Sequence, residues 1–205
     1  EYFNSQDYDV ILTTASLSLR LAMIAPRLKA ATIGWQHNCY DGYLHVKPVV
    51  FWQQENLLQQ YLPNLDRYIV LSDYDKRDYM EKLGIDCEVK INPRSFVSEK
   101  KCDVKSKRFL MATRFVYAKG LDLMMESFEE FCKEDSEWEL DIIGDGDLFD
   151  QIRADAKKRH LEKRVHFVGY TNEPEKYYLN SSVFLLPSRW EGWPMVIMEA
   201  FEFGR

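Results

Sequence analysis

Hydrophobic and polar positions follow two alternating patterns along the chain. Short apolar runs, typical of buried strands, are separated by longer stretches with the 3.6-residue spacing of a helix. In the first half they predict strands over 9–13, 31–35, 68–71 and 88–91, and helices over 17–29, 51–62 and 73–83. The third of these helices has Ser72 as its expected N-cap and ends at Gly84, a common helix terminator.

The same alternation returns after residue 107. It predicts strands over 108–112, 139–143, 165–168 and 183–186, and helices over 121–132, 148–160, 173–179 and 195–203. One face of the first helix is apolar and should pack in the core; it carries Leu121, Met124, Met125, Phe128 and Phe131. Strands that alternate with helices indicate βαβ units, so we expect an α/β fold with mostly parallel sheets.

A polar segment separates the two halves. Residues 94–107 are rich in Ser, Lys, Glu and Asp and have no apolar period, which is typical of a linker. We therefore expect one domain over 1–93 and a second over 108–205. The first has few strands for a doubly wound domain, and the second stops in or just after a helix without a closing strand. The chain also starts at Glu1 without an initiator Met, so we expect a fragment of a longer protein, truncated at both ends.

Composition excludes several classes of protein. The 27 basic and 33 acidic residues give a net charge of -6, which argues against a nucleic-acid-binding protein. No apolar run approaches the roughly 18 residues needed to span a bilayer. The cysteines are widely separated and without a CxxC pair, so we expect free thiols, a reducing cytoplasmic location and no zinc site; they are Cys39, Cys87, Cys102 and Cys132.

The most informative segment follows the predicted strand over 183–186. It reads Pro-Ser-Arg-Trp-Glu-Gly-Trp-Pro over 187–194 and continues into a helix. A loop at the carboxyl end of a parallel strand is where open α/β folds bind ligands. Pro194 suits the first turn of a helix, and the free backbone amides of Met195, Val196 and Ile197 would then form an anion site.

Two carboxylates lie eight residues apart on this segment, at Glu191 and Glu199. Their Pro-Ser, Glu-Gly and Glu-Ala context resembles the signature of the retaining GT-B-fold glycosyltransferases of the family-4 (group 1) type. The resemblance implies that Glu191 contacts the hydroxyls of the donor sugar and that Glu199 binds the ribose. The same resemblance implies a diphosphate held by the loop residues Gly192, Trp193, Pro194, Met195 and Val196.

A second motif follows the strand over 108–112. Residues 113–120 are similar to the GRxxxxKG loop of that family, with Arg114 and Lys119 as the basic pair and Thr113 in place of the usual Gly. The resemblance implies that both cations neutralise the donor diphosphate and make a metal unnecessary. Asp145 and Asp147 also have DxD metal-binding spacing, but the glycine turn around them fits the family pattern better.

Three further features support the resemblance. Gly144 lies in a strand-ending turn near the implied nucleotide, and Gly169 and Tyr170 lie in the loop implied to meet the base. In the first half, His37 follows the strand over 31–35. The resemblance implies that His37 lines the cleft near the donor sugar.

The implied fold is GT-B, with two Rossmann-like parallel-sheet domains. The implied function is transfer of a hexosyl group from a nucleotide-diphosphate sugar to a glycan or lipid-linked glycan in polysaccharide biosynthesis, with retention of configuration and no cofactor. Such acceptors also imply peripheral association with the inner face of the membrane. A non-catalytic nucleotide-sugar-binding or scaffolding protein, and a GT-B epimerase or phosphorylase, stay open as alternatives. The base, the sugar, the acceptor and the activity of the fragment by itself also stay open.

Overall fold

The computed structural model describes residues 1–46, 51, 53–102 and 104–204. Trp52, in the predicted helix over 51–62, Asp103, in the predicted linker, and Arg205, at the end of the second predicted domain, lie outside the described residues. The chain divides into two compact units. The first comprises Glu1–Pro93 with Trp190–Trp193, and the second comprises Arg94–Arg189 with Pro194–Arg205.

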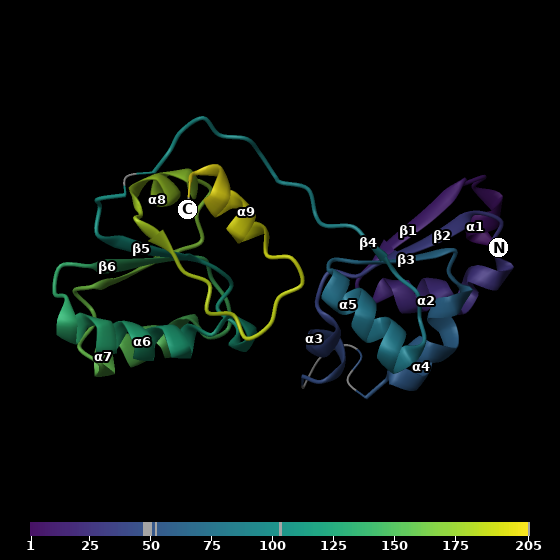
Figure 1. Ribbon diagram of the computed structural model, residues 1–205, viewed down its shortest axis with the longest axis horizontal. Helices are drawn as coiled ribbons and strands as arrows, with labels where there is room; N and C mark the ends of the chain where they lie inside the picture. The colour runs from purple at the N-terminus through teal and green to yellow at the C-terminus, as the bar shows by residue number, and fades with distance from the viewer. Residues whose placement is uncertain (47–50, 52, 103, 205) are drawn as a thin grey trace. The chain divides into compact units, whose positions relative to one another are not determined.

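The first unit contains a four-stranded parallel sheet in the order β1-β2-β3-β4. Its strands are β1 (Val10–Thr14), β2 (Ala31–Trp35), β3 (Arg67–Val70) and β4 (Glu88–Val89). Its α-helices are α1 (Tyr2–Ser5), α2 (Leu17–Ile24), α3 (Tyr40–Leu44), α4 (Glu55–Tyr61) and α5 (Asp73–Asp78). In Figure 1, α2, α4 and α5 lie on one side of this sheet.

The helices of the first unit differ from the prediction at several ends. α2 stops at Ile24 instead of residue 29 because Pro26 has no backbone N–H, and Ala25–Arg27 forms a 3-10 turn. α4 begins at Glu55 instead of residue 51, and the short helices α1 and α3 were not predicted. The predicted ends of the third helix are confirmed. The hydroxyl oxygen of Ser72 accepts from the backbone N–H of Asp75 (3.1 Å), and Gly84 ends the π-turn Tyr79–Leu83 with φ +69°.

The buried cluster of the first unit packs against one face of its sheet, although Ile69 of β3, on the other face, is also buried. The buried cluster there includes Ala22, Leu44, Leu58, Val70 and Tyr79. On β1 the other face carries Val10 and Leu12, which are 51% and 49% exposed. This sheet therefore has a packed face and a face where apolar side chains of its edge strand meet solvent.

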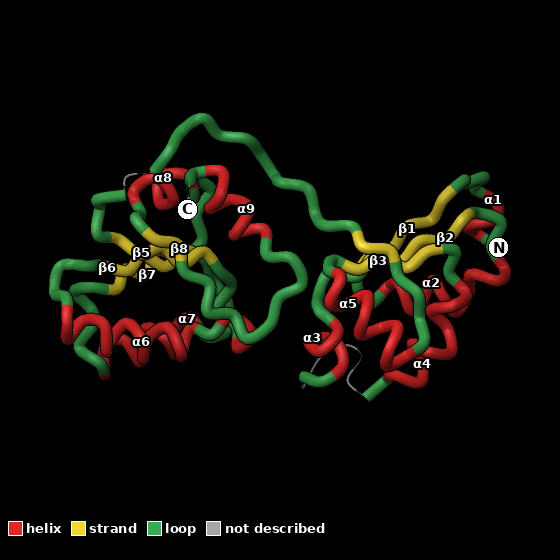
Figure 2. The backbone as a smooth tube through the Cα atoms, in the orientation of Figure 1, coloured by secondary structure: helices red, strands yellow, loops and turns green. Residues whose placement is uncertain are grey.

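The second unit contains another four-stranded parallel sheet, in the order β7-β6-β5-β8. Its strands are β5 (Arg108–Ala112), β6 (Glu139–Ile143), β7 (Val165–Gly169) and β8 (Val183–Phe184). Its α-helices are α6 (Leu121–Glu134), α7 (Phe149–Lys158), α8 (Glu175–Asn180) and α9 (Met195–Glu202). In Figure 2, α6 and α7 lie on one side of the sheet, and α8 and α9 on the other. The predicted α/β class with parallel sheets is confirmed.

Both faces of the second sheet are packed. Met111 and Leu140 belong to a buried cluster with Met125 and Phe128 of α6. The neighbouring strand residue Leu110 belongs to a second cluster, which includes Tyr178 of α8 and Ala200 and Phe203 of the C-terminal segment. The predicted apolar stripe of α6 is confirmed: four of its residues are buried and Phe131 packs against them; the four are Leu121, Met124, Met125 and Phe128.

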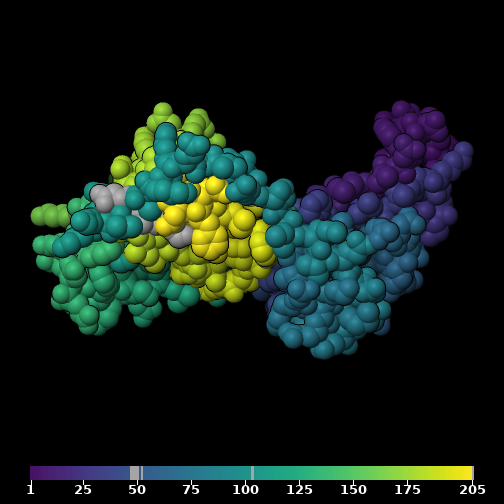
Figure 3. Space-filling model, turned by 45° about the horizontal axis from the view of Figure 1, so that its top comes forward, coloured from purple at the N-terminus to yellow at the C-terminus, as the bar shows by residue number. Residues whose placement is uncertain are grey.

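The C-terminal segment forms part of the surface of the second unit, where it is yellow in Figure 3. Phe201 of α9 is 64% exposed there. Within residues 1–46, 51, 53–102 and 104–204, every helix is too short or too polar to cross a bilayer.

Candidate active site

The strand order of the second sheet defines a place for a ligand. The chain runs from β5 to β6 to β7 in one direction and then returns to place β8 on the other side of β5. The order thus reverses between β5 and β8, and open α/β sheets bind ligands at the carboxyl ends of strands at such a switch point. The loops that flank this point are residues 113–120 and 185–194.

Backbone contacts connect the loops that follow β5, β6 and β7. The amide of Phe115 donates to the carbonyl of Asp145 (2.9 Å), and the amide of Gly144 donates to the carbonyl of Gly169 (2.9 Å). A Cβ atom at Gly144 would lie 1.8 Å from the carbonyl oxygen of Thr113, and its φ is +127°. Only glycine fits at residue 144, because both the conformation and the space exclude a side chain.

A cavity of about 250 Å³ opens at this edge of the sheet. Its lining residues come from four separate segments of the second unit: Ala112, Thr113, Arg114, Ile143, Gly144, Tyr170, Thr171 and Val196. Four of these residues were singled out from the sequence, namely Arg114, Gly144, Tyr170 and Val196. The structure brings them together although they lie up to 82 residues apart (196 − 114). Their roles in donor binding stay predictions.

The basic pair lies in the loop after β5. Arg114 is an exposed residue of the cavity wall. Lys119 is half-buried and ends the 3-10 turn Tyr117–Lys119, directly before Gly120 and α6. A Cβ atom at Gly120 would lie 2.1 Å from the carbonyl oxygen of Pro187, so this turn is packed against the loop after β8.

The loop after β8 continues into α9, which begins after Pro194 as predicted. Pro194 provides no side-chain cap, but its carbonyl accepts from the amide of Ile197 at 3.1 Å, so the prediction that this amide is free was wrong. Met195 and Val196 are the first two residues of this helix, and Val196 lines the 250 Å³ cavity. The positive end of the helix dipole therefore lies at the cavity, which favours an anion there.

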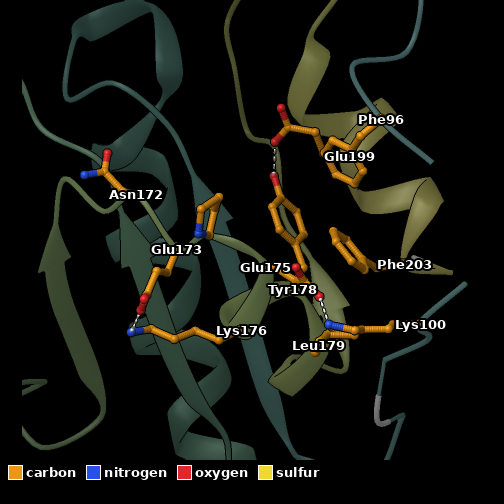
Figure 4. A pocket seen from close by; sticks show the side chains of 11 residues that line it. Phe96, Lys100, Asn172, Glu173, Glu175, Lys176, Tyr178, Leu179, Glu199 and Phe203 are labelled. Carbon is orange, nitrogen blue, oxygen red and sulfur yellow. Dashed lines mark hydrogen bonds and ion pairs between the residues drawn. The ribbon is translucent and has the colours of Figure 1, made fainter. Parts of the chain in front are cut away.

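Glu199 lies in the wall of a larger cavity, of about 580 Å³, between α8 and α9 (Figure 4). The hydroxyl of Tyr178, which is buried in α8, donates to Oε2 of Glu199 at 2.9 Å. Burial and the neighbouring Glu199 raise the pKa of Tyr178, so its hydroxyl stays protonated and available as a donor. No motif in the sequence indicates this partner, because Tyr178 lies 21 residues before Glu199 and outside the family pattern.

Ion pairs occupy the charged rim of the larger cavity. Lys100 pairs with Glu175 at 2.5 Å, and Lys176 pairs with Glu173 at 3.1 Å (Figure 4). Phe96 and Phe203 contribute the apolar wall, with ring centroids 5.5 Å apart. Residues near the start of the predicted linker thus form part of this wall.

The remaining candidates belong to the first unit. The ring of His37 stacks on Trp35 with centroids 5.3 Å apart, and partial desolvation lowers the pKa of His37. Its imidazole is therefore neutral at pH 7. Glu191, Gly192 and Trp193 lie in the short segment that groups with this unit. A Cβ atom at Gly192 would lie 2.8 Å from Cα of Asn38, so this segment approaches the residue after His37.

A metal site would need several ligands close together. In the part of the chain that the structure describes, no group of three or more His, Cys, Asp or Glu side chains could hold an ion. Catalysis without a metal stays a prediction for the donor site.

Comparison with known proteins adds the family. The model for glycosyl transferases group 1 matches residues 95–205. An uncharacterized glycosyltransferase of Haemophilus influenzae is 30% identical over 201 residues, which are 95% of this chain and 54% of that protein. A lipopolysaccharide 1,6-galactosyltransferase of Salmonella typhimurium is 31% identical over 100 residues, which are 47% of this chain and 28% of that protein.

Among solved structures, TarM has a similar fold. A complex of the S. aureus protein that contains UDP gives a TM-score of 0.75 at 22% identity and covers 86% of this chain and 36% of that chain. Another TarM crystal structure gives a TM-score of 0.81 at 20% identity and covers 96% of this chain and 39% of that chain. The likeness supports the GT-B fold. The chain spans about half the length of the Haemophilus relative. Because the family model covers more than half of the chain, the protein belongs to the glycosyl transferases group 1 family.

Proposed function

We propose that the protein transfers a hexosyl group from a nucleotide-diphosphate sugar to a glycan or lipid-linked glycan, with retention of configuration. The observation that carries the proposal is the 250 Å³ cavity at the switch point, where Arg114, Gly144, Tyr170 and the start of α9 meet. A cation, a glycine turn and a helix N-terminus suit a diphosphate bound next to a nucleoside. The names of the relatives, which include a galactosyltransferase, support a hexose donor.

The leaving group would be stabilised by charge. When the bond between the sugar and the phosphate breaks, negative charge accumulates on the nucleoside diphosphate. A cation about 4 Å from such a charge contributes about 4 kcal/mol at an effective dielectric constant near 20. Arg114 and Lys119 lie on the loop that follows β5, so they are the residues proposed to supply this stabilisation without a metal.

Glu199 would hold the ribose. Glu199 lines the larger cavity, and it lies three residues after Val196 on α9. The hydrogen bond that the Tyr178 hydroxyl donates fixes one carboxylate oxygen of Glu199 and thereby orients the other. A carboxylate accepts hydrogen bonds from the vicinal hydroxyls of a ribose, as the resemblance implies.

The sugar itself would be oriented by Glu191, by the backbone of Gly192 to Val196 and by His37. Because partial desolvation lowers the pKa of His37, we propose that it acts as a neutral hydrogen-bonding group. In the proposed reaction the acceptor oxygen attacks the anomeric carbon on the face from which the phosphate departs. The departing phosphate oxygen takes the acceptor proton, so no side chain serves as the base.

The acceptor is proposed from the relatives. One similar protein is named for lipopolysaccharide and another for amylovoran biosynthesis, so a surface glycan or its lipid-linked precursor is the proposed acceptor class. Location in the cytoplasm and association with the inner face of the membrane stay predictions.

Titration calorimetry with UDP and GDP tests the proposal. Lys119→Ala should weaken diphosphate binding about 10-fold or more, because it removes a charge-assisted hydrogen bond of about 1.5–3 kcal/mol. Glu191→Ala should abolish transfer in the full-length parent and leave nucleotide affinity unchanged. Lys158→Ala, on the exposed face of α7, is the matched control.

Three outcomes would contradict the proposal. Unchanged UDP and GDP affinity in Lys119→Ala would show that Lys119 does not bind the diphosphate. Nucleotide binding by a parent that transfers no sugar would favour the non-catalytic alternative. Release of a sugar phosphate with inorganic phosphate as the acceptor would favour a phosphorylase.

A further inference from the structure

Arg189 has an unusual number of partners for a loop residue. It lies in the loop after β8, and its side chain is only 19% exposed. Nη1 and Nη2 donate to the two carboxylate oxygens of Asp122 at 2.8 and 2.6 Å. Nη1 also donates to the carbonyl oxygen of Tyr117 at 2.9 Å. The guanidinium lies 4.0 Å from the centre of the Tyr117 ring.

The partners of Arg189 flank Lys119 in sequence. Tyr117 begins the 3-10 turn that ends at Lys119, and Asp122 lies in the first turn of α6, three residues later. The backbone adds a further bond, from the amide of Arg189 to the carbonyl of Ala118 at 2.7 Å. One residue therefore contacts the segment on both sides of Lys119.

The backbone next to Lys119 is constrained as well. Gly120 has φ +65°, and its Cα is so close to Pro187 that a Cβ would lie 2.1 Å from the Pro187 carbonyl oxygen. This contact, like those of Arg189, joins the loop after β5 to the loop after β8. The two loops flank the switch point, so the distance between them determines the width of the diphosphate site.

The guanidinium of Arg189 already has an anionic partner. Its bidentate pairing lowers the pKa of Asp122 and keeps that carboxylate ionised at neutral pH. A charge that is neutralised in this geometry contributes little to a second anion. Arg189 is therefore suited to hold the loop.

We propose that Arg189 is a positioning residue for Lys119: it holds the Tyr117–Lys119 turn against the loop after β8, so that the lysine meets the donor diphosphate without further ordering of the loop. This inference rests on the proposed function, in which Lys119 binds the diphosphate. Preorganisation of this kind raises affinity because the cost of ordering is met on folding. Arg189 itself makes no bond to the phosphate.

The test compares the binding of UDP with that of uridine, which lacks the diphosphate, by titration calorimetry on the 205-residue chain. Arg189→Ala should weaken UDP binding about 10-fold, within the range expected for one charge-assisted bond, and leave uridine affinity unchanged. Arg189→Lys should not restore UDP affinity, because an ammonium cannot pair with Asp122 in a bidentate manner. In a Lys119→Ala background, Arg189→Ala should have no further effect, because the two residues act through one contact.

Arg159→Ala is the matched control, since Arg159 also pairs with two carboxylates, Asp155 of α7 and Glu129 of α6. It should leave UDP affinity unchanged. If Arg189→Ala does not fold, Asp122→Asn provides the test instead, because it removes the ion pair with Asp122 and leaves Arg189 in place. We expect Asp122→Asn to weaken UDP binding and to spare uridine.

Three results would overturn the proposal. Additive effects of Arg189→Ala and Lys119→Ala would show that the residues act independently. Tighter UDP binding in Asp122→Asn would show that a released Arg189 binds the phosphate directly. If Lys119→Ala weakens UDP binding and Arg189→Ala does not, this inference fails and the proposed function stands. If Lys119→Ala has no effect, the proposed diphosphate site fails first.

Discussion

The two sheets of the protein have the same number of parallel strands but are covered differently. The second sheet has a buried cluster on each face. Among the described residues, the first sheet has a buried cluster on one face, and Val10 and Leu12 of its edge strand are about half exposed on the other. A sheet packed on both faces holds its strand ends rigidly, which a site built on loops requires.

Strand order differs as well. The strands of the first sheet follow one another in sequence, so the described part of that sheet has no reversal. The order of the second sheet reverses between β5 and β8. Backbone contacts at Gly144 and Gly120 then connect the loops on its carboxyl edge. The candidate donor site therefore depends on strand order and close backbone approach in addition to residue type.

The largest effect should come from glycine substitutions at these contacts. Gly144→Ala should lower the free energy of unfolding of the second unit by about 3 kcal/mol or more, because the new Cβ meets the Thr113 carbonyl at 1.8 Å. Gly84→Ala and Gly169→Ala should each cost about 1–2 kcal/mol, since both have positive φ but nothing within 4 Å of the added Cβ. Denaturant unfolding, with hydrogen exchange to assign each unit, measures the three values. Equal costs at the three positions would contradict the role of close approach.

Two leucines, one in each sheet, test whether the sheets are covered differently. Leu110→Ala on β5 should cost about 3 kcal/mol, because Leu110 is fully buried. Leu12→Ala on β1 should cost less than about 1 kcal/mol, because Leu12 is 49% exposed. The same unfolding measurements apply. A loss at Leu12 as large as that at Leu110 would mean that the open face of the first sheet is covered in solution.

Acid should change the stabilities of the two units in different ways, and the effect should be smaller than those of the substitutions above. His166 and Arg108 contact Glu139 in the second unit and hold the pKa of Glu139 below its usual value. Its contribution to stability is therefore present above about pH 4.3, the pKa in the unfolded chain, and is lost as the pH falls through the lower folded pKa. In the first unit, burial raises the pKa of Asp75, so its effect on stability has the opposite sign.

The two carboxyl groups can be measured separately. Between pH 5 and pH 3, the second unit should lose more stability in the unchanged protein than in Glu139→Gln. Relative to the unchanged protein, Asp75→Asn should stabilise the first unit more at pH 7 than at pH 4, because the buried Asp75 destabilises the folded state when it is ionised. Thermal unfolding at these pH values, followed by hydrogen exchange in each unit, measures both. Parallel pH curves for Glu139→Gln and the unchanged protein would contradict the first expectation.

Periodicity predicted the regular elements well where the apolar pattern was long. β5 and β6 have the predicted limits, and the apolar face of α6 is buried as expected. The misses have local physical causes. α2 ends early at a proline, and α3 has only five residues, too few to show a helical period.

The sequence also located most of the candidate donor site, because family motifs lie directly after predicted strands. It did not indicate Tyr178 as the partner of Glu199 or Arg189 as the partner of Asp122. Asp122 and Arg189 are 67 residues apart, and each is an ordinary surface residue by sequence pattern. Pairs of this kind arise only when the chain folds.

The order of residues along the chain was enough to predict the α/β class, the apolar faces and the chemical groups in the loops after β5 and β8. These depend on the order of residues within one segment, where spacing decides which side chains share a face. The tertiary structure decided which loops meet at the switch point, which glycines have no room for a side chain and which ion pair holds the lysine loop. These depend on contacts between distant segments, which no local spacing encodes.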